Sequence, residues 1–81
     1  MKATVLVRPK DGILDPQGEA VGGSLRRLAF PVTQVRVGRL VDLELDAASA
    51  VDAHAQIERM CAELLANPLI ESVEIHVEGD D

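Results

Sequence analysis

Aromatic residues are nearly absent from this sequence of 81 residues, which has one phenylalanine, Phe30, and no tryptophan or tyrosine. Proteins stack bases on aromatic rings, so their scarcity argues against an RNA-recognition domain. The hydrophobic residues, 47% of the chain, leave a core made of Val, Leu, Ile and Ala. We expect one domain over residues 1–81, which is marginally stable alone at this size and should self-associate.

Cysteine is scarce as well. Cys61 is the only one, which excludes an internal disulfide and fits a reducing compartment. The first apolar run, within residues 2–8, is broken at Pro9 and is too short for a signal peptide or a membrane span. From these two features we expect a cytoplasmic protein.

Positive charge is in the minority, with eight Lys and Arg against fourteen Asp and Glu and a net charge of −6. Phosphate binding needs clustered Lys and Arg, so this balance argues against nucleic acid as a partner. Residues 1–41 carry seven basic and three acidic side chains, whereas residues 42–81 carry one basic and eleven acidic. The pattern predicts either a solvated acidic face with a disordered acidic tail at 79–81, or two faces that suit different partners.

Alternation of apolar and polar residues predicts four strands. They cover residues 2–8, 33–37, 41–46 and 71–78. Gly38-Arg39 fits the two-residue turn of a hairpin between the second and third of these strands.

Capping signals predict two helices. Asp15 suits an N-cap, and Pro16 suits the first position of a helix that must end before Pro31. The second helix begins after Ser49 and ends near Ala66. The resulting order predicts an α+β, ferredoxin-like β-α-β-β-α-β fold, in which an antiparallel sheet carries two helices on one face and forms a dimer or higher oligomer.

The residues that carry chemistry are few and scattered. His54 precedes Cys61 by seven residues on one predicted helix, about 10 Å away, which is too far for a nucleophile–base pair. Two histidines and one cysteine in this arrangement also make no zinc site. We therefore predict no catalytic, cofactor-binding or metal-binding residue on this chain.

Three other groups of residues have two interpretations each. The acidic row of Asp42, Glu44 and Asp46 is a solvated strand face or, less readily, a collector of divalent cations. The arginines at 26, 27, 36 and 39 are a scattered surface set or a docking patch for an acidic partner. The pair Gly22-Gly23 indicates close approach of another backbone, or a frayed or kinked helix.

Three segments in register resemble a known family. Residues 7–21 (VRPKDGILDPQGEAV), 35–39 (VRVGR) and 60–71 (MCAELLANPLIE) are similar to segments of PurS, the small subunit of phosphoribosylformylglycinamidine (FGAM) synthase. The match runs over essentially the whole chain. Its departures, at Leu28-Ala29 and Arg39, are mild and remove no functional group.

The resemblance implies a non-catalytic subunit of an ATP-dependent, glutamine-using ligase of purine biosynthesis. Such a subunit bridges a glutaminase and a large synthetase subunit and helps ammonia pass between them, while ATP and magnesium are used by the large subunit. It further implies self-association to a dimer or tetramer. We expect the stretches 10–18, 36–39 and 67–71 to touch partner chains, and the candidates within them are Asp15, Pro16, Gln17, Gly18, Arg36, Arg39, Asn67 and Pro68.

A second hypothesis comes from another class of protein. Small domains of this predicted fold also bind metabolites at dimer interfaces through backbone groups and small side chains. On that hypothesis the chain is a homo-oligomeric regulatory module, and a ligand should raise its melting temperature.

Overall fold

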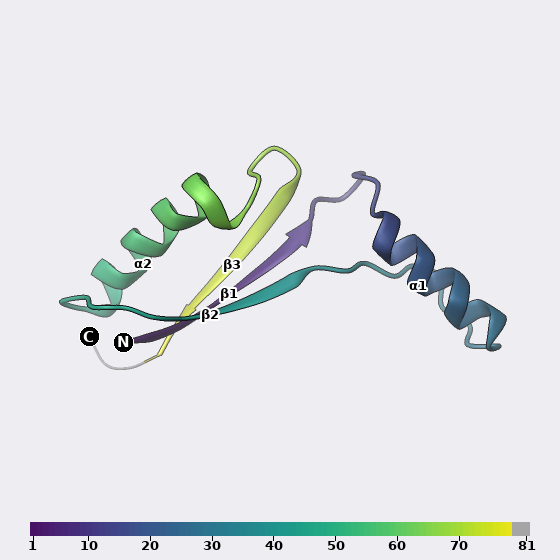
Figure 1. The fold of residues 1–81 in the computed structure, drawn as a ribbon, viewed down its shortest axis with the longest axis horizontal. Helices are drawn as coiled ribbons and strands as arrows, with labels where there is room; N and C mark the ends of the chain where they lie inside the picture. The colour runs from purple at the N-terminus through teal and green to yellow at the C-terminus, as the bar shows by residue number, and fades with distance from the viewer. Residues whose placement is uncertain (79–81) are drawn as a thin grey trace.

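The structure, a computed structural model, describes residues 1–78; the acidic tail predicted at 79–81 lies outside the described residues. The molecule is elongated, with extents of 50 × 24 × 15 Å. Figure 1 shows a sheet and one helix at one end and a second helix at the other. In chain order the elements are β1 (Lys2–Pro9), α1 (Pro16–Arg27), β2 (Arg39–Glu44), α2 (Ala50–Met60), the π-helical turn η1 (Cys61–Leu65) and β3 (Glu71–Val77).

Within residues 1–78 the sheet has three strands in the order β2-β1-β3, and β1 is antiparallel to both neighbours. Val5 is the centre of the register, because it pairs with Val41 on one side and with Ile75 on the other. These β-branched side chains share one face of the sheet, as period-two alternation requires. The antiparallel α+β class that the sequence predicts is thereby confirmed.

The core lies between this apolar face and α2. Ala3, Val5 and Val7 of β1 are buried, and they meet Ile57 and Cys61 of the helical segment. The opposite face of the sheet is polar and exposed at most positions, including Asp42 and Glu44. The sequence therefore predicts correctly which strand residues face the core and which face solvent.

Helix α1 begins as the sequence predicts and then extends beyond the sheet. Asp15 is its N-cap and Pro16 occupies its first position. Gly18 and Gly22, one turn apart, are buried against the extended segment 30–38, which runs back along the helix. A Cβ at Gly18 would lie 2.3 Å from the carbonyl oxygen of Val35, so the backbones approach as closely as glycine permits. At Gly22 a Cβ would meet the Val35 side chain at 3.4 Å, so the close approach there is to a side chain and not to a backbone.

Two details of the predicted fold are wrong. Residues 33–37 form no strand, and Gly38-Arg39 is no hairpin turn, because the chain continues straight from this segment into β2. A Cβ at Gly38 would lie 2.2 Å from the carbonyl oxygen of Val7, so Gly38 allows the chain to pass beside β1 instead of reversing. The Val37 amide is bound by the Asp15 carboxylate, which holds the segment to α1.

The prediction of two helices on one face is also wrong for the single chain. Among the described residues, α2 alone covers the sheet, whereas α1 stands clear of it (Figure 1). The second helix ends close to the predicted residue: Ser49 caps α2, η1 follows directly, and Ala66 is extended. Within residues 1–78, no helix combines the length and the apolar character needed to cross a membrane.

Candidate functional site

Antiparallel pairing gathers the predicted contact residues at one end of the sheet. Because β1 runs opposite to both neighbours, its last residue, Pro9, lies beside the starts of β2 and β3, where Val7 pairs with Arg39 and Pro9 pairs with Glu71. We call the residues 10–18, 36–39 and 67–71 at this end the sheet-end surface. The structure brings all eight candidates onto it, in two separate clusters.

The first cluster is built around Asp15. Its Oδ1 accepts a 3.0 Å hydrogen bond from the Gly18 amide, and its Oδ2 accepts a 2.7 Å hydrogen bond from the Val37 amide. One carboxylate thus caps α1 and fastens the segment that returns along it. Both amides favour the charged carboxylate, and the bond from Val37 contributes most to holding the pKa of Asp15 below its usual value.

Arg36 joins the same cluster from the returning segment. Its Nη1 donates to Asp11 Oδ1 at 2.5 Å, and its Nη2 donates to the Pro9 carbonyl. Of the remaining candidates, Pro16 supplies the helix start and Gln17 is exposed. In this cluster the side chains Asp15 and Arg36 hold a loop in place.

The second cluster joins β2 to the corner before β3. Arg39 binds the Glu71 carboxylate through two nitrogens, at 2.8 and 3.1 Å, and also donates to the Leu65 carbonyl at 2.5 Å. Glu71 in turn accepts a 2.8 Å hydrogen bond from the Asn67 amide. The guanidinium of Arg39, followed by the Asn67 amide, lowers the pKa of Glu71, while Glu71 raises the pKa of Arg39.

A lysine connects this corner to the loop after β1. Lys10 Nζ donates to the Pro68 carbonyl at 2.7 Å, and the Lys10 amide donates to the Ile70 carbonyl at 2.9 Å. Asn67 closes a local turn by accepting from the Leu69 amide at 3.1 Å. Both clusters therefore give the sheet-end surface a fixed backbone shape, which is what an interface formed by loops requires.

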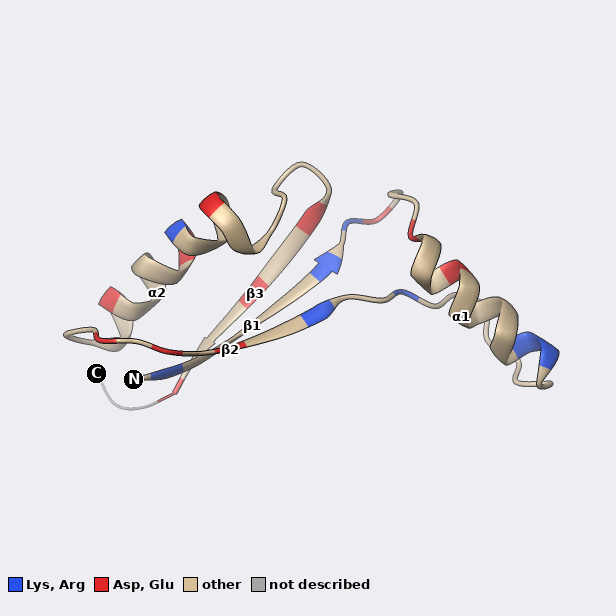
Figure 2. Ribbon diagram, viewed as in Figure 1, with Lys and Arg blue, Asp and Glu red and all other residues tan. Residues whose placement is uncertain are grey.

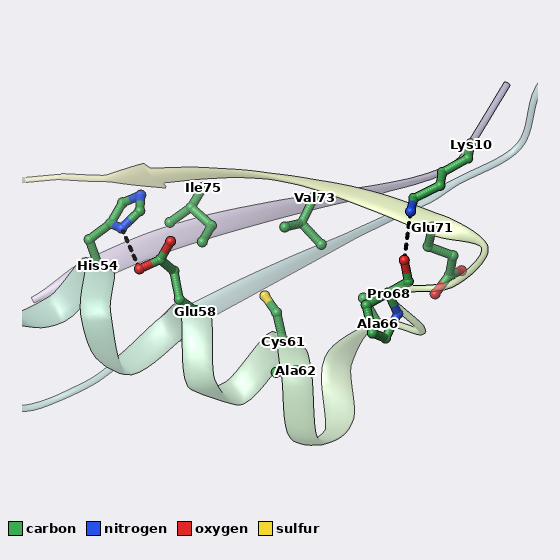
Figure 3. A pocket seen from close by; sticks show the side chains of 10 residues that line it. All are labelled: Lys10, His54, Glu58, Cys61, Ala62, Ala66, Pro68, Glu71, Val73 and Ile75. Atoms are coloured by element: carbon green, nitrogen blue, oxygen red, sulfur yellow. Dashed lines mark hydrogen bonds and ion pairs between the residues drawn. The ribbon is translucent and has the colours of Figure 1, made fainter.

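The groove beside α2 contains the residues that could carry chemistry (Figure 3). Cys61 is buried and its sulfur points toward the groove, where burial raises the pKa of its thiol. His54 faces Glu58 at 3.7 Å and lies two helical turns before Cys61. Within residues 1–78, no three His, Cys, Asp or Glu side chains gather closely enough to hold a metal ion.

Sequence reasoning included residues 10–18 and 67–71 in the predicted contact stretches but assigned no individual role to two kinds of residue within them. Lys10 and Glu71 make bonds that fix the corner, but their partners are distant in sequence and no local pattern identifies them. Leu14 and Leu69 are 76% and 82% exposed, far more than large apolar side chains usually are. The sequence does contain a signal for these two leucines, since each is an apolar residue in a stretch rich in loop-forming residues.

The fold and the site define a class of protein. Most polar side chains on the sheet-end surface bind the chain's own backbone or one another, and the same loops carry the exposed Leu14 and Leu69. This is the arrangement of a small α+β interaction domain, in which loops are held rigid to present apolar contacts.

Comparisons with known proteins identify the family. The family model described as "PurS: Phosphoribosylformylglycinamidine (FGAM) synthase" matches residues 2–79. The phosphoribosylformylglycinamidine synthase subunit PurS of Methanocaldococcus jannaschii is 36% identical over 78 residues, 95% of this chain and 94% of that protein. The chain belongs to the PurS family.

Solved structures agree with this assignment. The crystal structure of Methanocaldococcus jannaschii PurS superposes with a TM-score of 0.86 at 34% identity, covering 99% of this chain and 98% of that one. The structure of PurLQS from Thermotoga maritima matches with a TM-score of 0.84 at 32% identity, covering 93% of each chain. The likeness therefore extends over the whole fold, including α1 with its returning segment.

Proposed function

We propose that this chain is the non-catalytic small subunit of an FGAM synthase in de novo purine biosynthesis. In that role it self-associates, bridges the glutaminase and the large synthetase subunit, and assists the transfer of ammonia during conversion of formylglycinamide ribonucleotide (FGAR) to FGAM. The observation that carries the proposal is membership of the PurS family over residues 2–79. The match to a chain of the Thermotoga maritima PurLQS structure supports an assembly with further subunits.

The proposal gives the chain a physical task. Ammonia released in neutral water becomes ammonium, which has no lone pair with which to attack a carbon centre. Holding two active sites together, with water excluded between them, preserves free ammonia and raises its local concentration. The ATP and magnesium of the reaction are assigned to the large subunit, no cofactor is assigned to this chain, and the assembly is placed in the cytoplasm.

The sheet-end surface is the proposed contact with the larger subunits. Asp15, Arg36, Arg39 and Asn67 already have partners in their own chain, so their role in the contact is to fix its shape. The exposed side chains of Leu14 and Leu69 then supply the apolar contacts. On this proposal the eight candidates act in partner binding mainly by shaping the surface, and the leucines make the direct contacts.

The first experiment measures FGAM formation by matching glutaminase and synthetase subunits with and without this chain. Glutamine and free ammonia serve as parallel nitrogen sources. The proposal expects the chain to restore the reaction with glutamine, while the reaction with ammonia proceeds without it. Indifference of both reactions to the chain would overturn the proposal.

A pair of variants then tests the surface. Leu14→Ser together with Leu69→Ser should lower the glutamine-dependent rate about tenfold at limiting subunit concentration, and should leave the ammonia-dependent rate unchanged. The matched control is Val51→Ser, which removes an apolar side chain that is 75% exposed near the start of α2, away from the sheet-end surface. An equal loss in the control would locate the contact elsewhere.

The alternative, a regulatory module that binds a metabolite at a dimer interface, is not favoured by the family assignment. A thermal unfolding experiment on the isolated protein distinguishes the two hypotheses. A metabolite ligand would raise the melting temperature. The proposed subunit should instead be stabilised by its partner chains.

A further inference from the structure

Helix α1 shares little packing with the sheet and α2, which together we call the sheet body. Within the described part of the chain, the closely packed pairs of elements are β1 with β2, β1 with β3, α2 with β3 and α2 with η1, and α1 is in none of them. The core cluster likewise includes no residue between 10 and 38. Figure 1 shows α1 and the segment that returns along it projecting from one end of the sheet. The position of α1 therefore depends on the connections at that end.

Residues 15–37 form one unit, which we call the arm. At its base, the Asp15 carboxylate accepts a hydrogen bond from the Val37 amide. Along its middle, two buried glycines of α1 lie against the returning segment. At its far end, Arg26 donates to the Val32 carbonyl at 3.4 Å. Because these contacts run from base to tip, α1 and the returning segment can move only together.

The connection that leads from β1 into the arm is a short loop. Lys10 still belongs to the sheet body, because its side chain and its amide both donate to carbonyls of the corner before β3. Asp15 is the first residue of the arm, so residues 11–14 lie between the two. Gly12 in this loop has a φ of 83°, and a Cβ there would meet nothing within 4 Å. A glycine in open surroundings can change its backbone dihedral angles without meeting a neighbour.

The connection that leads back from the arm into β2 is a single residue. Val37 belongs to the arm through its bond to Asp15, whereas Arg39 belongs to the sheet body because it pairs with Val7 of β1. Gly38 lies between them. Hinges in proteins are a few loop or element-terminal residues that take up changes in the backbone dihedral angles. Both connections therefore have a glycine where the arm meets the sheet body.

Arg36 supplies side-chain bonds that cross from the arm toward the sheet body. Its Nη2 donates to the carbonyl of Pro9, the last residue of β1. Its Nη1 pairs at 2.5 Å with Asp11, whose side chain is 99% exposed. The isolated blue segment between α1 and β2 in Figure 2 is this arginine. An ion pair so open to water contributes little stability, so Arg36 can hold one arm angle and also release it.

The two hinges lie on the sheet-end surface, between its two exposed leucines. Leu14 is 76% exposed and directly precedes Asp15, the base of the arm. Leu69 is 82% exposed and belongs to the corner before β3, which is part of the sheet body. A partner that binds both leucines at once spans the hinges. Such a partner binds one arm angle better than the others and so shifts the population toward it.

We propose that the arm rotates about residues 11–14 and Gly38, that Arg36 is its latch, and that the larger subunits select one arm angle by binding Leu14 and Leu69 together. The twelve residues of α1 make a lever of roughly 18 Å. A rotation of about 20° at the hinges would move the tip of that lever by about 6 Å. The selection of an angle rests on the proposed function, which supplies the larger subunits, whereas the rotation itself is a property of the free chain.

The test measures distances between two spin labels in the full chain by pulsed electron paramagnetic resonance. The arm pair is Ala20→Cys on α1 with Val51→Cys on α2, both exposed positions, in a Cys61→Ala background. The reference pair is Val51→Cys with Asp42→Cys, which lies within the sheet body. Labelled chains are diluted with unlabelled ones, so that only distances within one chain are measured. In the free chain we expect the distance distribution of the arm pair to be about twice as wide as that of the reference pair.

Variants and partners should change the width for the arm pair in opposite directions. Arg36→Gln removes the latch and should widen the distribution by about half. Arg27→Gln is the matched control, because Arg27 donates to Ser24 within α1, and it should leave the width unchanged. Adding the larger subunits should narrow the distribution to the width of the reference pair, in the wild-type chain and in Arg36→Gln alike.

Two results in the free chain would overturn the rotating arm. They are equal widths for the two label pairs, and a width that Arg36→Gln leaves unchanged although the variant is folded by circular dichroism. A chain that restores the glutamine-dependent reaction while its arm distribution stays wide would overturn the selection of an angle and leave the proposed function standing. A chain that restores no reaction would overturn the proposed function and with it the selection, while the widths in the free chain still decide whether the arm rotates.

Discussion

Asp15 and Val37 are 22 residues apart, yet the Asp15 carboxylate accepts a 2.7 Å hydrogen bond from the Val37 amide. The same carboxylate caps α1 through Gly18. This single side chain therefore joins the start of α1 to the segment before β2, which also makes contacts through Arg36 and Gly38.

Replacing this carboxylate should loosen the helix and the returning segment together. Asp15→Ala removes an N-cap and leaves the Val37 amide without its partner, so we expect the melting temperature to fall by a few degrees. Asp15→Asn should lower the melting temperature less, because the side-chain amide oxygen still accepts one of the two hydrogen bonds. Asp46→Ala removes an exposed acidic side chain and serves as the control, with little change expected.

Stability should decline in acid through Asp15 and Glu71. The hydrogen bonds that they accept lower both pKa values in the folded state, below the ordinary values of 3.8 and 4.5. Between the folded and the ordinary pKa values the unfolded chain binds more protons than the folded one. The free energy of unfolding therefore keeps the whole contribution of the two carboxylates above about pH 5, and it falls as pH drops through the folded pKa values. Urea unfolding at pH 7, 4.5 and 3.5 measures the loss.

The variant Glu71→Gln isolates one half of this effect. It should be less stable than the wild type at pH 7, since the carboxylate held by Arg39 is gone. Its further loss of stability between pH 5 and pH 3 should be smaller. Parallel pH curves for the two proteins would contradict the role of this pair.

Two glycines of α1 should respond to alanine in opposite directions. Gly18→Ala places a Cβ 2.3 Å from the Val35 carbonyl oxygen and should cost about 1–3 kcal/mol in the free energy of unfolding. Gly23 has only the flexible end of Arg27 nearby, at 3.7 Å, so Gly23→Ala should stabilise the protein by about 0.5–1 kcal/mol. Chemical denaturation of both variants measures the difference, and an equal loss would contradict the packing of Gly18 on the returning segment.

The core beneath α2 can be tested within that helix. Ile57 is fully buried, so Ile57→Ala should cost about 2–5 kcal/mol through lost burial and the cavity left behind. Val51, on the same helix, is 75% exposed, and Val51→Ala should change stability by less than about 0.5 kcal/mol. Denaturant unfolding of the pair distinguishes the buried face of α2 from its solvated one.

The elements that the sequence predicts correctly are those with local signals. The Asp15 cap with Pro16, the Ser49 cap, and the alternation along β1 depend on residues near one another in the chain. The segment 33–37 has the same alternation as a strand but finds no neighbouring strand within residues 1–78. Alternation reports a preference for extended backbone, and it cannot report whether another strand is within reach.

In the candidate site, too, local sequence patterns were informative and contacts between distant residues could not be predicted. Resemblance to the family selected residues that lie together at one end of the sheet, but their bonds to one another join distant parts of the chain. Arg39 and Glu71 are 32 residues apart, and their pairing follows from the register on both sides of β1. No local pattern contains that information. The role of these residues at an interface with other subunits stays a prediction.

Arg39 offers a way to test whether the corner must be rigid for assembly. Arg39→Lys keeps the charge but cannot make two parallel bonds to Glu71 and a third to the Leu65 carbonyl. Amide exchange in residues 65–71 should then quicken about tenfold, while exchange in β1 changes little. The glutamine-dependent rate should fall in the same variant if a fixed corner is what the partner subunits bind. Arg8→Lys is the matched control, because Arg8 makes one 3.3 Å contact with Glu74 on the open face of the sheet. Equal exchange at the corner in both variants would show that Arg39 does not hold it.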